Sequence, residues 1–81
     1  MRNGQLGSDM DVKITTEVAG RICAIPVSVG GSVGNGDDIA IVEAMKMEIP
    51  VPSPAAGHIK SILVNIDDVV SEGQTIAVIE T

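Results

Sequence analysis

The sequence predicts an all-β domain, a flattened barrel or sandwich in which two four-stranded halves are related by a pseudo-twofold axis. Three observations lead to this fold class. The chain has 81 residues, enough for one small domain. Its β-branched residues alternate with a period of two, and its two halves are copies of one another. Since Phe, Trp and Tyr are absent, Val, Ile, Ala and a few Met and Leu must build the core.

An internal repeat covers the chain from residue 10 onward. A shift of 37 positions places Met10–Ala44 on Met47–Thr81 without a gap, and eleven of the 35 pairs are identical. The identical pairs include the turn glycines Gly36 and Gly73. A Val/Ile-rich chain would give a few matches by chance, but eleven in register indicate that the halves fold alike. Residues 1–9 are polar and lack periodicity, so we expect a disordered tail, either linker or cloning remnant, followed by one domain over residues 10–81.

Each half is expected to contain four short strands. Alternation at residues 12–14 and 49–51 predicts the first strand of each half. After Ile22 the alternation slips by one residue, and it slips again after Ile59 in the second copy, which predicts a bulge or a corner between two sheets. The runs 39–42 and 76–79 are apolar at every position, as in strands closed between two layers.

Three prolines mark an edge strand. Pro50, Pro52 and Pro54 lie two residues apart, so in a strand they lack N–H groups along the same edge. An exposed edge tolerates this loss, whereas a central strand does not. The alternative is a proline-rich linker between two domains, but a half of about 35 residues without disulfides or metal is too small to fold alone.

The repeat gives residues 44–47 a special location. Lys46-Met47 corresponds to Asp9-Met10, where the chain enters the other half. A twofold axis places these two points at opposite ends of the domain. We therefore expect residues 44–47 to form a hairpin tip at the end farthest from residues 10 and 81.

Composition and charge argue against several functions. The formal net charge of −6 would be repelled by a phosphate backbone, and no aromatic ring is present to stack on bases. No apolar run has the length of a membrane span, and no signal-peptide core is visible. We expect a soluble, monomeric domain of the cytoplasm, or of the mitochondrial matrix in a eukaryote, without nucleic-acid or direct membrane contact.

The single cysteine and the single histidine give no catalytic pattern. Cys23 has no partner for an internal disulfide, and no Cys or His cluster has metal-ligand spacing. We expect Cys23 to be a small buried apolar residue. A Ser-His-Asp or Cys-His site would have to use His58, but a lone histidine in a strand-rich chain is usually a surface or packed side chain.

The predicted tip carries the strongest functional signal, the segment Glu43-Ala44-Met45-Lys46-Met47-Glu48. Hairpin tips usually contain Asn, Asp or Gly, so a lysine between two methionines is unusual there. The lysine is either a solvated surface residue or a functional one. An ammonium group on a rigid turn, far from both ends of the domain, is well placed to be acylated by another protein. Physical reasoning alone leaves both interpretations open.

This hexapeptide resembles the biotin attachment motif of biotin carboxyl carrier proteins and of the biotinyl domains in biotin-dependent carboxylases and decarboxylases. The resemblance extends over residues 10–81 and implies the barrel-sandwich hybrid fold of a non-catalytic, swinging-arm carrier. The sequence departs from the family at Asp67-Asp68, where Gly-Asp is usual, and aspartate tolerates the first position if its backbone is left-handed. It also lacks room for a "thumb" loop between residues 29 and 33, so it resembles the thumbless biotinyl domains.

The resemblance assigns roles to the residues of the tip. Lys46 would carry biotin through an amide on its Nζ atom. The flanking positions of the motif are Met45, Met47, Ala44, Glu43 and Glu48. A biotin protein ligase would attach the cofactor using ATP, biotin carboxylase would carboxylate it from bicarbonate, and a carboxyltransferase or decarboxylase subunit would remove the carboxyl group. The cofactor supplies the chemistry and the domain supplies its placement.

Two alternatives come from the same resemblance. Lipoyl carrier domains of 2-oxo acid dehydrogenase complexes share the fold and the lysine position, but they usually read Asp-Lys-Ala where this chain reads Met45-Lys46-Met47. Membrane-fusion adaptors of efflux pumps use the fold as an unmodified structural module, but they normally carry long helical insertions at the tip. The sequence does not identify the acceptor substrate or the parent enzyme.

Overall fold

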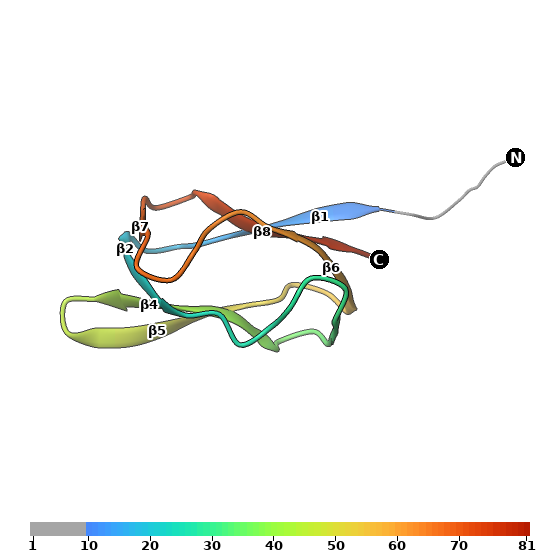
Figure 1. Cartoon of the computed structure of the whole chain (residues 1–81), viewed down its shortest axis with the longest axis horizontal. Helices are drawn as coiled ribbons and strands as arrows, with labels where there is room; N and C mark the ends of the chain where they lie inside the picture. The colour runs from blue at the N-terminus through green and yellow to red at the C-terminus, as the bar shows by residue number, and fades with distance from the viewer. Residues whose placement is uncertain (1–9) are drawn as a thin grey trace, which may run out of the picture.

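The computed structural model describes residues 10–81, which form eight strands and no helix (Figure 1). The strands are β1 (Asp11–Thr15), β2 (Gly20–Ala24), β3 (Ser32–Val33), β4 (Asp38–Ala44), β5 (Met47–Pro52), β6 (Gly57–Ile62), β7 (Val69–Val70) and β8 (Thr75–Glu80). The all-β prediction is confirmed. The expected tail at residues 1–9 lies outside the described residues, and no helix in the described part is long and apolar enough to cross a membrane.

The strands form two antiparallel four-stranded sheets, with the orders β1-β8-β6-β3 and β5-β4-β2-β7. A shift of 37 residues converts the first order into the second, because β1 becomes β5, β8 corresponds to β4, β6 to β2 and β3 to β7. Each sheet therefore contains two strands from each half of the sequence. The predicted pseudo-twofold symmetry is present, and it exchanges the sheets.

The hydrogen bonds of the turns follow the same symmetry. The Gly36 N–H donates to the Ser53 carbonyl at 2.8 Å, and the corresponding Gly73 N–H donates to the Thr16 carbonyl at 2.7 Å. Both glycines have positive φ, 89° and 84°, which explains why glycine occupies both positions. The hydroxyls of the buried residues Thr16 and Ser53 donate in turn to main-chain carbonyls two residues further on.

The core lies between the two sheets and consists of aliphatic side chains. Its largest fully buried members come in repeat-related pairs, among them Ile22 with Ile59 and Ile39 with Ile76. Without aromatic residues, the core consists of aliphatic side chains, the largest of which are isoleucines. The domain is elongated, measuring 49 × 19 × 18 Å.

Bulges account for the irregular patterns in the sequence. In β2 the pairing to β4 shifts between Ile22 and Ala24, and in β6 the pairing to β8 shifts between Ile59 and Ser61. These are the predicted slips, and they occur at matching positions. The chain then passes from β2 in one sheet to β3 in the other.

The apolar runs 39–42 and 76–79 do form strands, but the prediction that these strands are closed between two layers was wrong. These strands are not covered on both faces, because Ile41 and Val78 are only half-buried. Instead, the pairing of β4 with β5 shifts between Asp38 and Ala40, so the consecutive residues Ile39 and Ala40 are both buried. A bulge, rather than a second covering layer, therefore explains why two consecutive residues of the run are buried.

The edge strand predicted from the prolines is present, but it contains only two of the three. Strand β5 contains Pro50 and Pro52 and forms the edge of its sheet, and Pro54 follows it. Cys23 differs from the expectation, because it is half-buried rather than buried. It lies at the bulge of β2, where no cross-strand partner fixes it into the regular in-and-out alternation.

Candidate functional site

Strands β4 and β5 form a hairpin that projects at one end of the molecule, opposite the end where β1 begins and β8 finishes (Figure 1). Ala44 and Met47 are cross-strand partners, so only Met45 and Lys46 form the turn. At the other end, the Thr81 N–H donates to the Met10 carbonyl at 2.9 Å. The predicted hairpin tip at residues 44–47, remote from residues 10 and 81, is present.

Both turn residues adopt a left-handed backbone conformation. The φ angles of Met45 and Lys46 are 52° and 65°. Two consecutive positive φ angles are the requirement of a type I′ hairpin turn, which usually contains Asn-Gly or Gly-Gly. A left-handed conformation costs an L-residue with a Cβ atom roughly 1–2 kcal/mol. The turn therefore holds two residues with Cβ atoms in an unfavourable backbone conformation.

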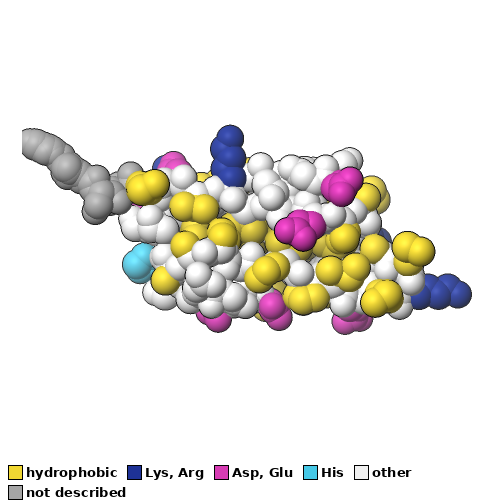
Figure 2. All heavy atoms as spheres, turned by 180° about the vertical axis from the view of Figure 1, so that it is seen from behind, with side chains coloured by type: hydrophobic (Ala, Val, Ile, Leu, Met, Phe, Trp, Pro, Cys, Tyr) yellow, Lys and Arg dark blue, Asp and Glu magenta, His cyan; other side chains and the backbone are white. Residues whose placement is uncertain are grey.

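The tip side chains are exposed to solvent. Met45 is 94% exposed and Met47 62%, and Lys46 is also exposed. Figure 2 shows a basic side chain projecting at the narrow end of the molecule, with hydrophobic side chains beside it. Within residues 10–81, no hydrogen bond or ion pair involves the Lys46 ammonium group. The Lys46 Nζ atom is thus accessible from a wide range of directions.

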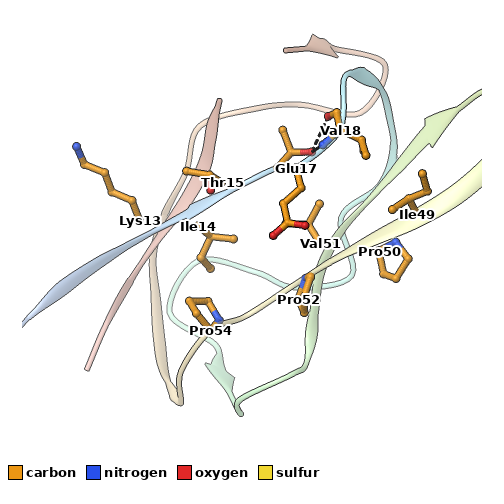
Figure 3. Close-up of a pocket in the computed structure, with 11 residues that line it drawn as sticks. Lys13, Ile14, Thr15, Glu17, Val18, Ile49, Pro50, Val51, Pro52 and Pro54 are labelled. Atoms are coloured by element: carbon orange, nitrogen blue, oxygen red, sulfur yellow. Dashed lines mark hydrogen bonds between the residues drawn. The ribbon is translucent and has the colours of Figure 1, made fainter. Parts of the chain in front are cut away.

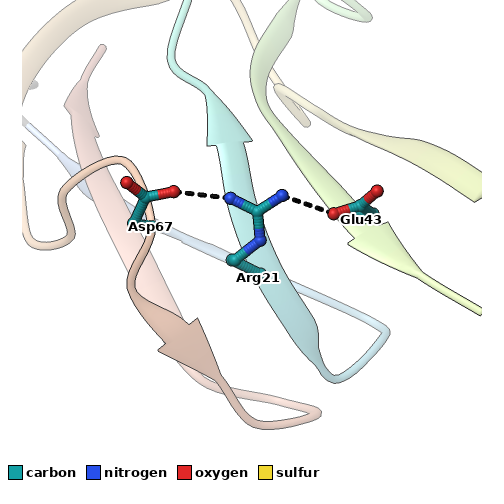
Figure 4. Close-up of polar contacts among 3 residues, drawn as sticks. All are labelled: Arg21, Glu43 and Asp67. Atoms are coloured by element: carbon teal, nitrogen blue, oxygen red, sulfur yellow. Dashed lines mark hydrogen bonds and ion pairs between the residues drawn. The ribbon is translucent and has the colours of Figure 1, made fainter. Parts of the chain in front are cut away.

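Two glutamates flank the tip on the same face of the hairpin. Glu43 and Glu48 are cross-strand partners, and two like charges in this arrangement destabilise a sheet. Arg21 from β2 offsets this repulsion, because it is the cross-strand partner of Glu43 and its guanidinium pairs with the Glu43 carboxylate. The second arm of the guanidinium pairs with Asp67 in the loop between β6 and β7 (Figure 4).

The Arg21 bridge connects the base of the hairpin to a neighbouring loop. Hydrogen bonds to Glu43 first, and to Asp67 second, raise the pKa of Arg21 above its ordinary value, so the guanidinium stays charged. Sequence reasoning missed Arg21, because its partners lie 22 and 46 residues away. Asp67 has a φ of 78°, and its counterpart Gly30 has 88°, so aspartate replaces glycine here at a position with a left-handed backbone.

Two concave regions lie along β5. A groove of about 350 Å³ runs between the edge strands β1 and β5 and is lined by Ile14, Val51 and the three prolines (Figure 3). A second region of about 360 Å³, which we call the tip hollow, lies at the base of the hairpin. The tip hollow is lined by Glu17, Val18, Ala19, Ala44, Met45, Met47, Ile49 and Glu72. Lys46 lines neither region, so its amine is not enclosed in a binding pocket.

The six residues singled out from the sequence lie together, on the last residues of β4, the turn and the first residues of β5. The single cysteine and histidine do not join them. Cys23 is in β2 and His58 is exposed on β6, in the other sheet. Sequence reasoning missed Glu17 and Glu72 at the tip hollow, since they come from two loops that lie far from the hairpin in the sequence.

An exposed lysine on a projecting turn, without a partner in the described part of the chain, is suited to covalent attachment of a group that must reach sites on other proteins. The arrangement at the tip offers no enclosed pocket for a freely bound cofactor, and no group of three metal-ligating side chains occurs within residues 10–81. A group attached to the Lys46 amine would extend away from the body of the domain.

Comparisons with known proteins agree with this arrangement. A family model described as "Biotin-requiring enzyme", of the biotin/lipoyl type, matches residues 10–79. Among solved structures, the urea carboxylase of Kluyveromyces lactis is 32% identical, with a TM-score of 0.83 over 98% of this chain. A single-chain, multi-domain long-chain acyl-CoA carboxylase is 25% identical, with a TM-score of 0.80 over 88%. No curated protein sequence matches.

The present chain spans only 7% of each of those two carboxylase chains. The likeness therefore concerns one small unit of each multi-domain protein, and the family match covers the whole described domain except its last two residues. The fold, the projecting hairpin and the family match lead to one conclusion. The chain belongs to the biotin/lipoyl attachment-domain family.

Proposed function

We propose that this domain is a biotin carrier and that the Nζ atom of Lys46 is the attachment point. The observation that carries the proposal is the exposed lysine, which has no hydrogen-bond partner among residues 10–81, on a left-handed two-residue turn at the far end of the domain. The strand lysines Lys13 and Lys60 differ from it, because both lie at regular strand positions and Lys60 pairs with Asp11. The backbone cost of this turn is explained if its residues are kept for recognition.

The chain's own residues have three tasks in this proposal. The hairpin presents the amine of Lys46 as the nucleophile for a biotin carboxyl group that the ligase has activated with ATP, and amide formation would release the activating group and a proton. Met45 and Met47 provide flexible apolar surface on both sides of the acceptor. The bridge from Arg21 to Glu43 holds the base of the hairpin in place. When attached, biotin supplies the chemistry of carrying a carboxyl group.

The domain itself is proposed to be non-catalytic. Its partners would be a biotin protein ligase, a biotin carboxylase that loads the carboxyl group, and a carboxyltransferase or decarboxylase subunit that takes it. A tethered carrier raises the effective concentration of the reactive group at each site, which is the benefit of this arrangement. The two carboxylases among the structural neighbours support biotin over lipoate. So does the Met45-Lys46-Met47 sequence, which differs from the usual lipoyl tip.

Intact-mass measurement after expression with a biotin protein ligase tests the proposal. We expect the mass of one biotin amide on the wild-type domain. The Lys46→Arg variant should give no streptavidin signal, because a guanidinium remains protonated and is a poor acyl acceptor. Its free energy of unfolding should lie within about 0.5 kcal/mol of wild type, since the side chain is exposed.

The other strand lysines provide matched controls. Lys13→Arg and Lys60→Arg should label as wild type does, because both residues lie within strands. Continued labelling of Lys46→Arg would place the acceptor elsewhere, and a lipoyl mass on the wild-type domain would favour the lipoyl alternative. An unmodified wild-type domain would favour the structural alternative.

A further inference from the structure

The tip hollow differs from its symmetry counterpart at the other end of the domain. Repeat alignment places Pro54 at the position of Glu17 and Asn35 at that of Glu72. At the far end, the Asn35 side-chain amide donates a hydrogen bond to the Pro54 carbonyl at 3.1 Å and so joins the two loops. At the tip, two glutamates occupy these positions, and carboxylates do not donate to each other. The fold therefore does not require the tip hollow to be open and acidic.

The lining of the tip hollow combines an apolar floor with two carboxylates. The floor consists of Val18, Ala19, Ala44, Met47 and Ile49, and Met45 stands beside it, 94% exposed. Glu17 and Glu72 are both exposed, and within residues 10–81 neither takes part in an ion pair. Apolar surface next to two unpaired negative charges is complementary to an apolar side chain flanked by Lys or Arg.

The tip hollow continues into the groove between β1 and β5. Both regions share Glu17, Val18 and Ile49, and Figure 3 shows the Glu17 side chain directed toward the space between the two strands. Because Pro50 and Pro52 lack N–H groups, a segment lying there cannot pair with β5 as a regular added strand. Side-chain contacts must therefore provide most of the recognition.

We propose that the tip hollow is a docking site for a basic segment of the ligase that modifies Lys46. The segment would place an apolar side chain against Val18, Ala19 and Met47 and pair Lys or Arg with Glu17 and Glu72. This inference rests on the proposed function. The ligase is the partner that acts before any cofactor is attached, so it must recognise the surface of the protein itself. A second copy of this chain, with its net charge of −6, has the wrong charge for this site.

The test measures kinetics of biotin transfer by a purified biotin protein ligase, with the apo domain as substrate. The double variant Glu17→Gln/Glu72→Gln removes both carboxylates and should raise KM by about threefold or more without lowering kcat, as expected for two exposed charge pairs at an interface. The rise of wild-type KM with ionic strength should be reduced in this variant. The matched control Asp38→Asn/Glu80→Gln removes two exposed charges far from the tip and should leave KM unchanged.

A second pair of variants tests the shape of the site without changing charge. Ala19→Leu fills the tip hollow and should raise KM, whereas Ala56→Leu makes the same change at the symmetry-related position and should not. Thermal unfolding of all variants checks that the domain stays folded. A wild-type KM for both the double variant and Ala19→Leu would overturn the proposal.

If the tip hollow binds something other than a ligase segment, the same variants give different results. If the attached arm occupies the tip hollow, Ala19→Leu should shift the NMR signals of the biotinylated domain without changing ligase KM, which contradicts the proposal. If a second copy occupies it, ultracentrifugation should detect a dimer that Ala19→Leu dissociates, which also contradicts it. Absence of biotin on wild-type Lys46 would instead reject the proposed function, so the two failures are distinguishable.

Discussion

Among the glycines of the domain, Gly20 is the one at which substitution by alanine should lower the free energy of unfolding the most. A Cβ atom built on Gly20 would lie 2.3 Å from the Glu43 carbonyl oxygen and 2.8 Å from Val42 Cγ1. Contacts under 3.0 Å with backbone do not occur for real Cβ atoms, so β2 and β4 must move apart by roughly 1 Å to restore contact. Overpacking of this kind costs about 1–3 kcal/mol.

The expected cost of Gly20→Ala is thus about 2 kcal/mol, which lowers Tm by roughly 8–16 °C for a domain of this size. The repeat supplies a matched pair, because a Cβ atom on Gly57 would lie 2.5 Å from the Glu80 carbonyl oxygen. Gly57→Ala should therefore destabilise to a similar extent. Gly34→Ala is the control, since its Cβ atom would be 3.6 Å from the nearest atom and the other copy carries Ser71 there.

Differential scanning calorimetry or far-ultraviolet circular dichroism should measure these transitions, because the chain has no aromatic residue for intrinsic fluorescence. The reasoning is refuted if Gly20→Ala melts within about 2 °C of wild type, well below the shift expected from overpacking. It is also refuted if Gly34→Ala is as destabilising as Gly20→Ala, because steric contact would then not be the cause.

Two further predictions concern the methionines and the buried hydroxyls. Met45→Leu and Met47→Leu keep apolar bulk at exposed positions, so the free energy of unfolding should change by less than about 1.5 kcal/mol, while the rate of ligase-catalysed biotinylation should fall; unfolded yet fully labelled variants would reverse these roles. Thr16→Val and Ser53→Ala remove buried hydroxyls that donate to main-chain carbonyls at 2.7 and 2.6 Å, so each should cost about 1–3 kcal/mol in chemical denaturation. Unchanged midpoints would show that these hydrogen bonds are dispensable.

The repeat made most of the architecture predictable from the sequence. Residues 37 apart had to occupy equivalent positions, which located the turn glycines, the paired bulges and the tip at residues 44–47. The composition of the sheets was not predictable, because the pairing of β1 with β8 joins residues sixty or more positions apart. No local pattern encodes such a pairing.

The site was predictable only where it is contiguous in sequence. Lys46 and its flanking methionines were found because they are adjacent and stand at the tip. The left-handed backbone at Met45 was not foreseen, since residue propensity favours Gly or Asn there. Arg21 and the two glutamates of the tip hollow were missed, because only the folded chain brings their segments to the hairpin.

The 37-residue shift exchanges the two sheets, so the single chain has the twofold symmetry that a homodimer would have. Two separate copies of a half-length chain could present the same eight strands in the same two orders. Such a dimer would have free ends at both extremities and no hairpin. Fusion of the halves creates one covalent junction, and that junction is the turn at Met45 and Lys46. A symmetric scaffold thereby acquires a single, unrepeated lysine tip, and under the proposed function one copy of the domain offers one acceptor.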